Sequence, residues 1–309
     1  MKDWIEYSAF MLAARLAGLF RFPAIARFGA FAGSLVFLLT PVRKRVVSDN
    51  LAHAFPEKSQ MERRRIAHGA YRNYGTSVFT MLWCRNRSEP ELKGTVRLMN
   101  REVLDRYLQD RRGFILLSGH FGCWELIIHA VRLHLGRPVA TIVQTQRNRR
   151  IDAVVDSIRT QWGNETIPMG LSSARESLRV LREGGVIAAL ADQSAARESI
   201  FVPFFGRPVA AHRGVAALSL RTGAPILMHF LIRRPDHAYD VVFEEIPAAD
   251  LDGYNETNIL ELTRRHTAML ERYVRLYPDH WLWMHKRWKH TAYHEGPENT
   301  AGAADGVEA

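Results

Sequence analysis

Four residues separate His120 from Glu125 in the segment Ser118–Glu125, which also contains Gly119 and Gly122. An imidazole readily takes a proton near neutral pH, and a neighbouring carboxylate can fix its tautomer and stabilise the imidazolium. The expected chemistry is proton abstraction from an incoming hydroxyl, with His120 as general base and Glu125 as its partner. The two glycines allow the backbone to turn sharply beside a ligand.

Three other interpretations of this segment remain open from the residues alone. His120 and Glu125 could form an ordinary ion pair in a capped surface loop. Cys123 could be a nucleophile activated by His120, although a cysteine in a helix is more often a small apolar packing residue. Glu125 and His129 could bind a metal together with His120, but the His-Glu-x-x-His pattern is absent from the sequence.

The elements predicted around this segment place it at the edge of a sheet. The short apolar run 113–117 is typical of a buried strand, and 123–135 is typical of a helix that ends at Gly136. His120 is therefore expected at the carboxyl end of a strand, with Glu125 about one turn into the following helix. Open α/β sheets bind ligands at this edge, and the positive end of the helix is expected to help bind oxyanion or phosphate charge.

Strands and helices alternate along the rest of the chain. Ser59–Glu62 and Ser173–Glu176 have the sequence of capping boxes that begin helices, and the stretch from Asp192 to Gly206 is expected to be mostly loop. The order predicts an α/β fold with a mostly parallel or mixed central sheet flanked by helices. Further strands are predicted over 139–143, 186–191, 225–232 and 239–245, and further helices over 60–83, 100–110, 151–162, 214–221 and 255–276.

The amino-terminal region favours association with a membrane. Ser8–Phe20 and Phe28–Thr40 are strongly apolar, but arginines interrupt the region and neither run reaches the roughly 20 residues of an uninterrupted span. Interfacial amphipathic helices, or one inserted helix with snorkelling arginines, fit this pattern, and buried helices of a soluble core are the alternative. The basic cluster Arg43–Arg45 would keep the rest of the chain on the cytoplasmic side.

The 309-residue chain has a net charge of +10, which suits anionic partners such as phospholipid headgroups, phosphorylated substrates, an acidic carrier protein or nucleic acid. The only cysteines, Cys84 and Cys123, are far apart in the sequence, which disfavours a disulfide framework or a structural zinc site. The tryptophans and basic residues of 281–289 could form a nucleic-acid stacking surface, but no known nucleic-acid-binding motif accompanies them. A structural cap of the domain or an aromatic contact with the membrane interface is favoured instead.

Ser118–Glu125 strongly resembles the His-x-x-x-x-Asp/Glu motif of glycerolipid-type acyltransferases. More specifically, the chain resembles the late (lauroyl/myristoyl) acyltransferases of lipid A biosynthesis, because several further segments match that family in order. Together the matching segments extend over roughly residues 40 to 290. They are Asn50–Glu57, Ser118–Glu125, Gly185–Gln193, Val202–Gly206 and Tyr277–Trp288.

The resemblance implies direct acyl transfer without an acyl-enzyme, with His120 as general base and Glu125 orienting it. The donor would be a thioester on acyl carrier protein, or acyl-CoA, and no other cofactor and no metal is expected. The acceptor would be a hydroxyl of a phosphorylated glycolipid, such as a lipid A precursor, at the cytoplasmic face of the inner membrane. The same chemistry on another lipid, a thioesterase, and a non-catalytic membrane-binding module are the alternatives.

The resemblance also indicates residues that would bind substrate. Asp192 resembles the family's acidic site residue, with Gln193 beside it, although an aspartate that caps a turn would fit as well. Arg147, Arg149 or Arg150 would supply positive charge where the family has an arginine after the second strand. Gly122 would approach the ligand, and Phe204 and Phe205 would either line an acyl groove or form a packed turn. Two departures from the family, Gln144 and His212, concern the identity of the acceptor.

Three parts of the chain are predicted. Residues 1–41 would form a membrane-associated helical anchor, and residues 42–294 would form one α/β acyltransferase domain. Residues 295–309, rich in glycine, alanine and acidic residues, would be a disordered tail.

Overall fold

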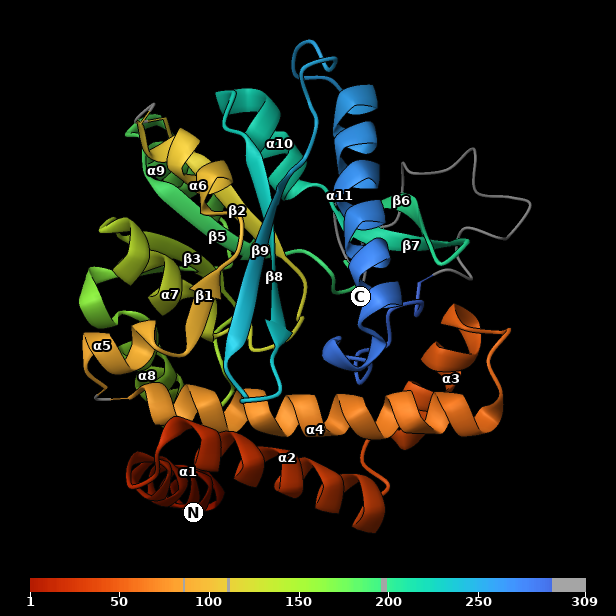
Figure 1. Ribbon diagram of the computed structural model, residues 1–309. Helices are drawn as coiled ribbons and strands as arrows, with labels where there is room; N and C mark the ends of the chain where they lie inside the picture. The colour runs from red at the N-terminus through yellow and green to blue at the C-terminus, as the bar shows by residue number, and fades with distance from the viewer. Residues whose placement is uncertain (86, 110–111, 196–198, 291–309) are drawn as a thin grey trace.

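A seven-stranded sheet forms the centre of the protein (Figure 1). The structure is a computed structural model that describes residues 1–85, 87–109, 112–195 and 199–290, so the tail predicted over 295–309 lies outside the described residues. The strands follow the order β1-β9-β8-β2-β5-β3-β4. Their bounds are β1 Val96–Leu98, β2 Phe114–Ser118, β3 Val139–Val143, β4 Glu165–Pro168, β5 Val186–Leu190, β8 Ile226–Arg233 and β9 Tyr239–Glu245.

The strands of this sheet are parallel except at one pair, β8 with β9. At its centre β2 pairs with β5 in a register that runs from Phe114↔Val186 to Ser118↔Leu190. The carboxyl ends of these two strands therefore lie side by side. The predicted mostly parallel, mixed sheet is confirmed.

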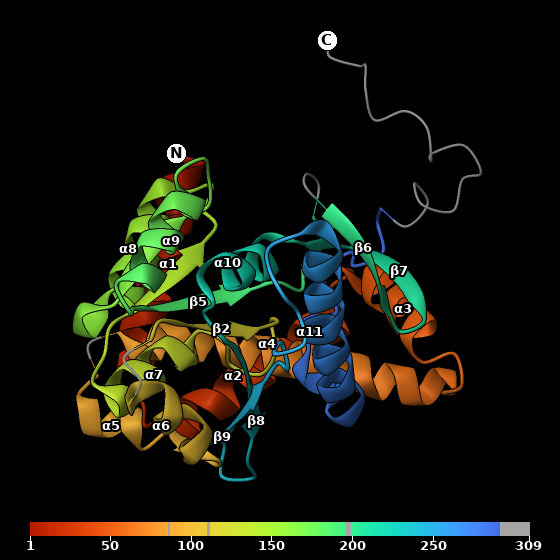
Figure 2. The same cartoon turned by 90° about the horizontal axis from the view of Figure 1, so that it is seen from above.

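Both faces of the sheet are covered by helices, as the alternation along β2 shows. Phe114 and Leu116 pack into one apolar cluster, and Ile115 and Leu117 pack into another. Successive side chains of a strand point to opposite faces, so a strand buried on both faces is a continuous apolar run. Figure 2 shows the two helical layers, with α6 and α7 on one side of the sheet and α9 and α10 on the other.

The helices that form these layers are mostly those expected from the sequence. The short helices α5, η1 and η2 connect larger elements. The bounds are α5 Glu89–Lys93, α6 Arg101–Gln109, α7 Leu126–Leu135, α8 Arg149–Arg159, η1 Gln161–Gly163, α9 Ser173–Arg182, α10 Gly214–Thr222, α11 Glu256–Leu276 and η2 Pro278–His280.

Four amino-terminal helices form a further layer, with α2 alongside α4 (Figure 1). They are α1 Lys2–Gly18, α2 Phe22–Leu39, α3 Lys44–Ala54 and α4 Gln60–Cys84. The Ser59–Glu62 capping box at the start of α4 is confirmed, because Glu62 N donates to Ser59 Oγ and Ser59 N donates to Glu62 Oε2. The helices α2 and α4 pack so closely that a β-carbon at Gly33 would lie 2.1 Å from the Tyr71 carbonyl oxygen.

Several local predictions were wrong, for different reasons. Ser173–Glu176 is not a capping box: the amino-terminal cap of α9 is Ser172, and the Ser173 hydroxyl donates to the Gly170 carbonyl. The stretch expected to be loop contains the first strand and the turn of a hairpin, β6 Ser199–Phe204 paired antiparallel with β7 Arg207–His212. The edge strands β1 and β4 were not predicted, because three or four residues are too few to show a period.

Candidate functional site

The candidate site lies where the central strands β2 and β5 end. His120 follows β2 by two residues, and Asp192 follows β5 by two residues. Because β2 and β5 are parallel neighbours, both side chains are delivered to the same edge of the sheet. A hydrogen bond from Ala191 N to the Ser118 carbonyl, 3.1 Å long, extends the pairing up to the site.

Asp192 holds His120 through both carboxylate oxygens. The Nδ1 atom of His120 lies 2.7 Å from Asp192 Oδ1, and the backbone N–H of His120 donates to Oδ2 over 2.7 Å. The indole Nε1–H of Trp281 donates to the same Oδ2 over 2.8 Å. With Nδ1 donating to a carboxylate, the ring is fixed as the tautomer that has its lone pair on Nε2.

The charges of the two groups support each other. Burial alone would lower the pKa of His120, but the Asp192 carboxylate outweighs burial, and the pKa of the imidazole is raised above its ordinary value. Burial alone would raise the pKa of Asp192, but the charge and hydrogen bonds of His120 lower it to about 2. Asp192 is therefore ionised at neutral pH and stabilises a protonated His120.

The Nε2 atom of His120 points away from Asp192. The side chain of His120 is 18% exposed, against 3% for Asp192, so a reactant can approach the imidazole but not the carboxylate. The side-chain amide of Gln193 lies 3.3 Å from Nε2, as a long hydrogen bond that an incoming hydroxyl can replace. The ring of Trp124 packs edge-on against the imidazole, with centroids 5.1 Å apart. This arrangement is that of a general base held by a carboxylate.

Glu125 does not hold the imidazole as expected, because Asp192 occupies Nδ1. Instead, the Glu125 carboxylate accepts two hydrogen bonds from Arg159 of α8, at 2.5 and 2.9 Å. Glu125 also precedes α7 as its N-cap, rather than lying one turn into the helix. Its negative charge nevertheless reaches His120 and contributes to the raised pKa of the imidazole, after the contribution of Asp192.

Gly122 shapes the loop between β2 and α7. Its φ is +59°, and a β-carbon there would lie 2.1 Å from the Leu231 carbonyl oxygen, so the turn requires glycine. Its N–H donates to the His280 carbonyl, and its carbonyl accepts hydrogen bonds from Asn73 and Ser77 of α4. Both backbone groups of Gly122 thus have partners within the protein, so the structure gives it a part in building the loop.

The arginines expected to bind substrate lie near the carboxyl end of β3 and face α1. Arg147 is 75% exposed and lies 3.5 Å from the carboxylate of Glu6, and the guanidinium of Arg150 stacks over Trp4 at 3.9 Å. Arg149 begins α8 and is exposed. Arg159 lies closer to the site, through its pair with Glu125, and sequence reasoning missed it because Glu125 is distant in the sequence.

The aromatic residues near the carboxyl terminus form a structural cap over the site. Phe204 is fully buried against Trp281 and Trp288, and Phe205 is buried against Trp283. The phenylalanines therefore form a packed turn in the hairpin and contact the tryptophan segment. Trp281 has a second function, which the sequence did not reveal: it donates a hydrogen bond to Asp192.

The rival interpretations of the motif have less structural support. Cys123 is fully buried, and burial raises the pKa of its thiol to about 12, which disfavours a reactive thiolate. His129 is also buried, and its pKa is lowered to about 4 by burial. Within the described ranges of the chain, no group of three or more His, Cys, Asp or Glu residues has the arrangement of a metal site.

The two departures from the family pattern, Gln144 and His212, lie at the ends of different strands. Gln144 follows β3 and is exposed, and His212 ends β7 with its pKa lowered, mainly by burial. The identity of the acceptor therefore stays a prediction.

Comparison with known proteins shows the family of this chain. The chain is 23% identical over 276 residues to the lipid A biosynthesis palmitoleoyltransferase of Escherichia coli (strain K12), covering 87% of this chain and 86% of that protein. It is 22% identical to the lauroyltransferase (93% and 90% covered) and 24% identical to the myristoyltransferase (92% and 85% covered) of lipid A biosynthesis from the same organism. Residues 1–290 match the family described as bacterial lipid A biosynthesis acyltransferase. The chain belongs to this family of acyltransferases.

Proposed function

We propose that this protein transfers a fatty acyl group from a thioester donor to a hydroxyl of a lipid A precursor or a similar glycolipid, with His120 as general base. The observation that carries the proposal is the contact between His120 Nδ1 and Asp192 Oδ1 at 2.7 Å, which leaves Nε2 for the substrate. Membership of the family supports the acyl transfer and the kind of acceptor.

The proposed reaction is a direct displacement at the thioester carbonyl. His120 Nε2 takes the proton of the acceptor hydroxyl while the hydroxyl oxygen forms a bond to the carbonyl carbon of the thioester. When the tetrahedral intermediate collapses, the carbon–sulfur bond breaks and the thiolate receives the proton from the imidazolium. Asp192 stabilises the transient positive charge on His120 and prevents the ring from turning. The positive end of α7 remains our proposed site for the oxyanion.

Glu125 is proposed to act on His120 through space. Arg159 holds the Glu125 carboxylate in a largely buried position, with side chains 14% and 15% exposed. The Glu125 carboxylate raises the pKa of the imidazole without touching it, and the Arg159 charge partly offsets this effect. Glu125 is therefore a positioning and electrostatic residue in this proposal, and Asp192 is the direct partner of His120.

The donor is proposed to be acyl carrier protein loaded with a fatty acid, or acyl-CoA. The net charge of +10 suits the acidic surface expected of a carrier protein. The relatives are named for three different acyl chains at nearly equal identity, so their similarity does not select a chain length.

We propose further that the amino-terminal helices lie in the interface of the inner membrane, with the site on the cytoplasmic side. Among the described helices, α2 alone is long and apolar enough to cross a membrane, and a third of it is buried within the protein. Its contact with α4 favours the interfacial position, because a spanning α2 would carry charged residues of α4 into the bilayer. The outward surface of α2 and its end is apolar and exposed, comprising Phe28, Phe31, Leu35, Val36, Leu38, Leu39 and Val42.

The proposal is tested by incubating the purified enzyme with an acyl thioester, with and without a lipid A precursor, and measuring products by mass spectrometry. We expect the acceptor to gain the mass of one acyl chain, with little free fatty acid formed in its absence. Rapid release of free fatty acid without acceptor would instead indicate a thioesterase. Transfer to a different lipid would keep the chemistry and change the acceptor.

A further inference from the structure

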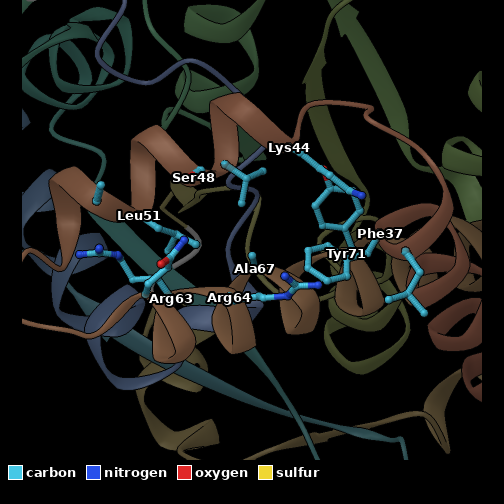
Figure 3. Close-up of a pocket in the computed structure, with 12 residues that line it drawn as sticks. Phe37, Lys44, Ser48, Leu51, Arg63, Arg64, Ala67 and Tyr71 are labelled. Atoms are coloured by element: carbon cyan, nitrogen blue, oxygen red, sulfur yellow. The ribbon is translucent and has the colours of Figure 1, made fainter.

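A cavity of about 390 Å³ lies where the carboxyl end of α2 meets α3 and α4 (Figure 3). Its volume is within the range of small-molecule sites in proteins. His120, Asp192 and Gln193 are not among the residues that line it. The cavity is therefore not used in the proposed acyl transfer.

The cavity is positively charged. Among the described residues that line it, Lys44, Arg63 and Arg64 are cationic and none is acidic. Figure 3 shows Lys44 of α3 and Arg64 of α4 on the side of the cavity near Phe37, whereas the Arg63 side chain of α4 extends away from them. Two neighbouring cations without an acidic neighbour in the lining are the complement of an anion.

The cations are held in place without being neutralised. The Lys44 ammonium lies 5.6 Å and the Arg64 guanidinium 5.9 Å from the ring centroid of Phe37, and Arg63 donates to the Phe55 carbonyl over 3.2 Å. In the part of the chain that the structure describes, none of the three forms an ion pair with a carboxylate. Their charge is therefore available to a ligand.

The amino terminus of α3 adds to the positive potential. The helix α3 begins at Lys44, which lines the cavity, and has no acidic residue in its first turn, whereas the start of α4 is already satisfied by the Ser59–Glu62 capping box. The unpaired N–H groups and dipoles at helix amino termini favour anions, phosphate above all.

The floor of the cavity is apolar and its rim opens onto an apolar surface. Val47, Leu51 and Tyr71 are buried in the floor. Leu38 lines the cavity and is 58% exposed, and the exposed residues of α2 continue from it. A ligand that fits both parts has an anionic head and a hydrocarbon chain.

We infer that this cavity binds one anionic glycerophospholipid of the membrane. Its phosphate lies between Lys44 and Arg64, and one acyl chain passes over Phe37 and Leu38 toward the exposed face of α2. The bound lipid fixes α3 and the end of α2 to the membrane surface. The inference rests on the proposed membrane association, but not on the chemistry of His120.

The test is a calorimetric titration of the full-length protein, in uncharged detergent, with short-chain phosphatidylglycerol. Phosphatidylcholine of the same chain length and inorganic phosphate are the comparison ligands. The pocket variant K44Q/R64Q is matched by R45Q/R65Q, which removes the same charge from the same two helices at residues that do not line the cavity. A second variant, S48W, keeps the charge and fills the space, because Ser48 lines the cavity and is exposed.

We expect phosphatidylglycerol to bind more tightly than either comparison ligand. K44Q/R64Q should weaken its binding by roughly tenfold or more, because charge-assisted contacts are lost, and S48W should weaken it as well. R45Q/R65Q should bind as the unaltered protein does. Unchanged thermal unfolding of each variant shows that the loss is not one of folding.

Equal weakening in K44Q/R64Q and R45Q/R65Q would overturn the inference, since it would mean general surface attraction. If inorganic phosphate bound as tightly as phosphatidylglycerol, the cavity would be a site for a free anion and the inference would also be wrong. An H120A variant separates this site from catalysis: it should bind phosphatidylglycerol normally while transfer is lost. If K44Q/R64Q raised the KM for the glycolipid acceptor in the absence of phospholipid, the cavity would belong to the acceptor and the inference would be wrong.

Discussion

Asp192 contacts both the ring and the backbone of His120, so the position and the tautomer of the imidazole are fixed by the same carboxylate. The Trp281 indole holds that carboxylate from another side. A base prepared in this way needs little rearrangement when the acceptor hydroxyl arrives. At the scale of residues, the proposed activity depends on this arrangement.

Replacing Asp192 with asparagine tests that dependence. We expect D192N to lower kcat/KM by roughly a hundredfold or more, because the imidazolium loses its stabilising charge. In the unaltered enzyme the rate should rise with pH through the raised pKa of His120, since the neutral imidazole is the base. Loss of the carboxylate should move this rise to lower pH. A pH–rate profile with its rise unmoved would show that Asp192 does not set the pKa of His120.

The sequence drew attention to His120 and Asp192, but it predicted that Glu125 holds the imidazole, whereas the structure places Asp192 against it and Glu125 against Arg159. Glu125 was chosen because it is near in the sequence and because the family motif includes it. The contact with Asp192 spans 72 residues and exists because β2 and β5 are neighbours in the sheet. The order of strands could not be deduced from the alternation of strands and helices.

At the scale of elements, the Glu125–Arg159 pair links the loop before α7 to the end of α8. We expect E125Q or R159M alone to destabilise the protein by about 3 kcal/mol, since each leaves one largely buried charge without its partner. The double variant should recover part of this loss. Denaturant unfolding of the three variants gives the coupling energy, and strictly additive effects would contradict a direct interaction.

The contact between α2 and α4 also supports the loop that carries His120. Gly33 of α2 packs against the backbone of α4, and Asn73 and Ser77 of α4 donate hydrogen bonds to the Gly122 carbonyl in the loop that carries His120. The helix α4 thus connects α2 to the loop that carries His120.

We expect G33A to destabilise the protein by about 1–3 kcal/mol, because the added methyl group would meet the backbone carbonyl of Tyr71. The matched control is G214A, at the start of α10, where a β-carbon meets nothing within 4 Å. That variant should be neutral or slightly stabilising. Equal effects of both variants on thermal unfolding would argue against the close packing of α2 and α4.

The elements with strong local patterns were predicted well, and the others were not. The strand β3, the helix α11 and the cap of α4 match their predictions closely, because apolar periodicity and capping residues are local signals. The first strand and the turn of the hairpin β6–β7 were expected to be loop, yet β6 pairs with β7 along its whole length, including Pro203 with Pro208. Its stability comes from contacts with the tryptophan segment, which no local pattern reveals.

At the scale of the whole molecule, the exposed apolar surface of α2 belongs to the helical layer that supports the loop of His120. The predicted anchor, residues 1–41, is packed on the domain predicted over 42–294, so α1 and α2 are in direct contact with the layer that supports the site. This arrangement would place the loop of His120 close to the membrane in which a glycolipid acceptor is held.

Membrane association is tested with F31E/L39E, which places charges on two exposed residues of α2. We expect this variant to lose binding to vesicles in a flotation assay, while its thermal unfolding stays unchanged. The control L171E/L276E changes two exposed leucines outside the amino-terminal helices and should bind as the unaltered protein does. Loss of binding in both variants, or in neither, would contradict the proposed orientation.

The most direct test of the account is acyl transfer by an H120A variant, measured by mass spectrometry of a lipid A precursor incubated with an acyl thioester. We predict that the variant folds normally and that its transfer rate falls by roughly a thousandfold or more, because the acceptor hydroxyl has lost its base. A folded H120A variant that acylates the precursor at a rate near that of the unaltered enzyme would contradict the central claim.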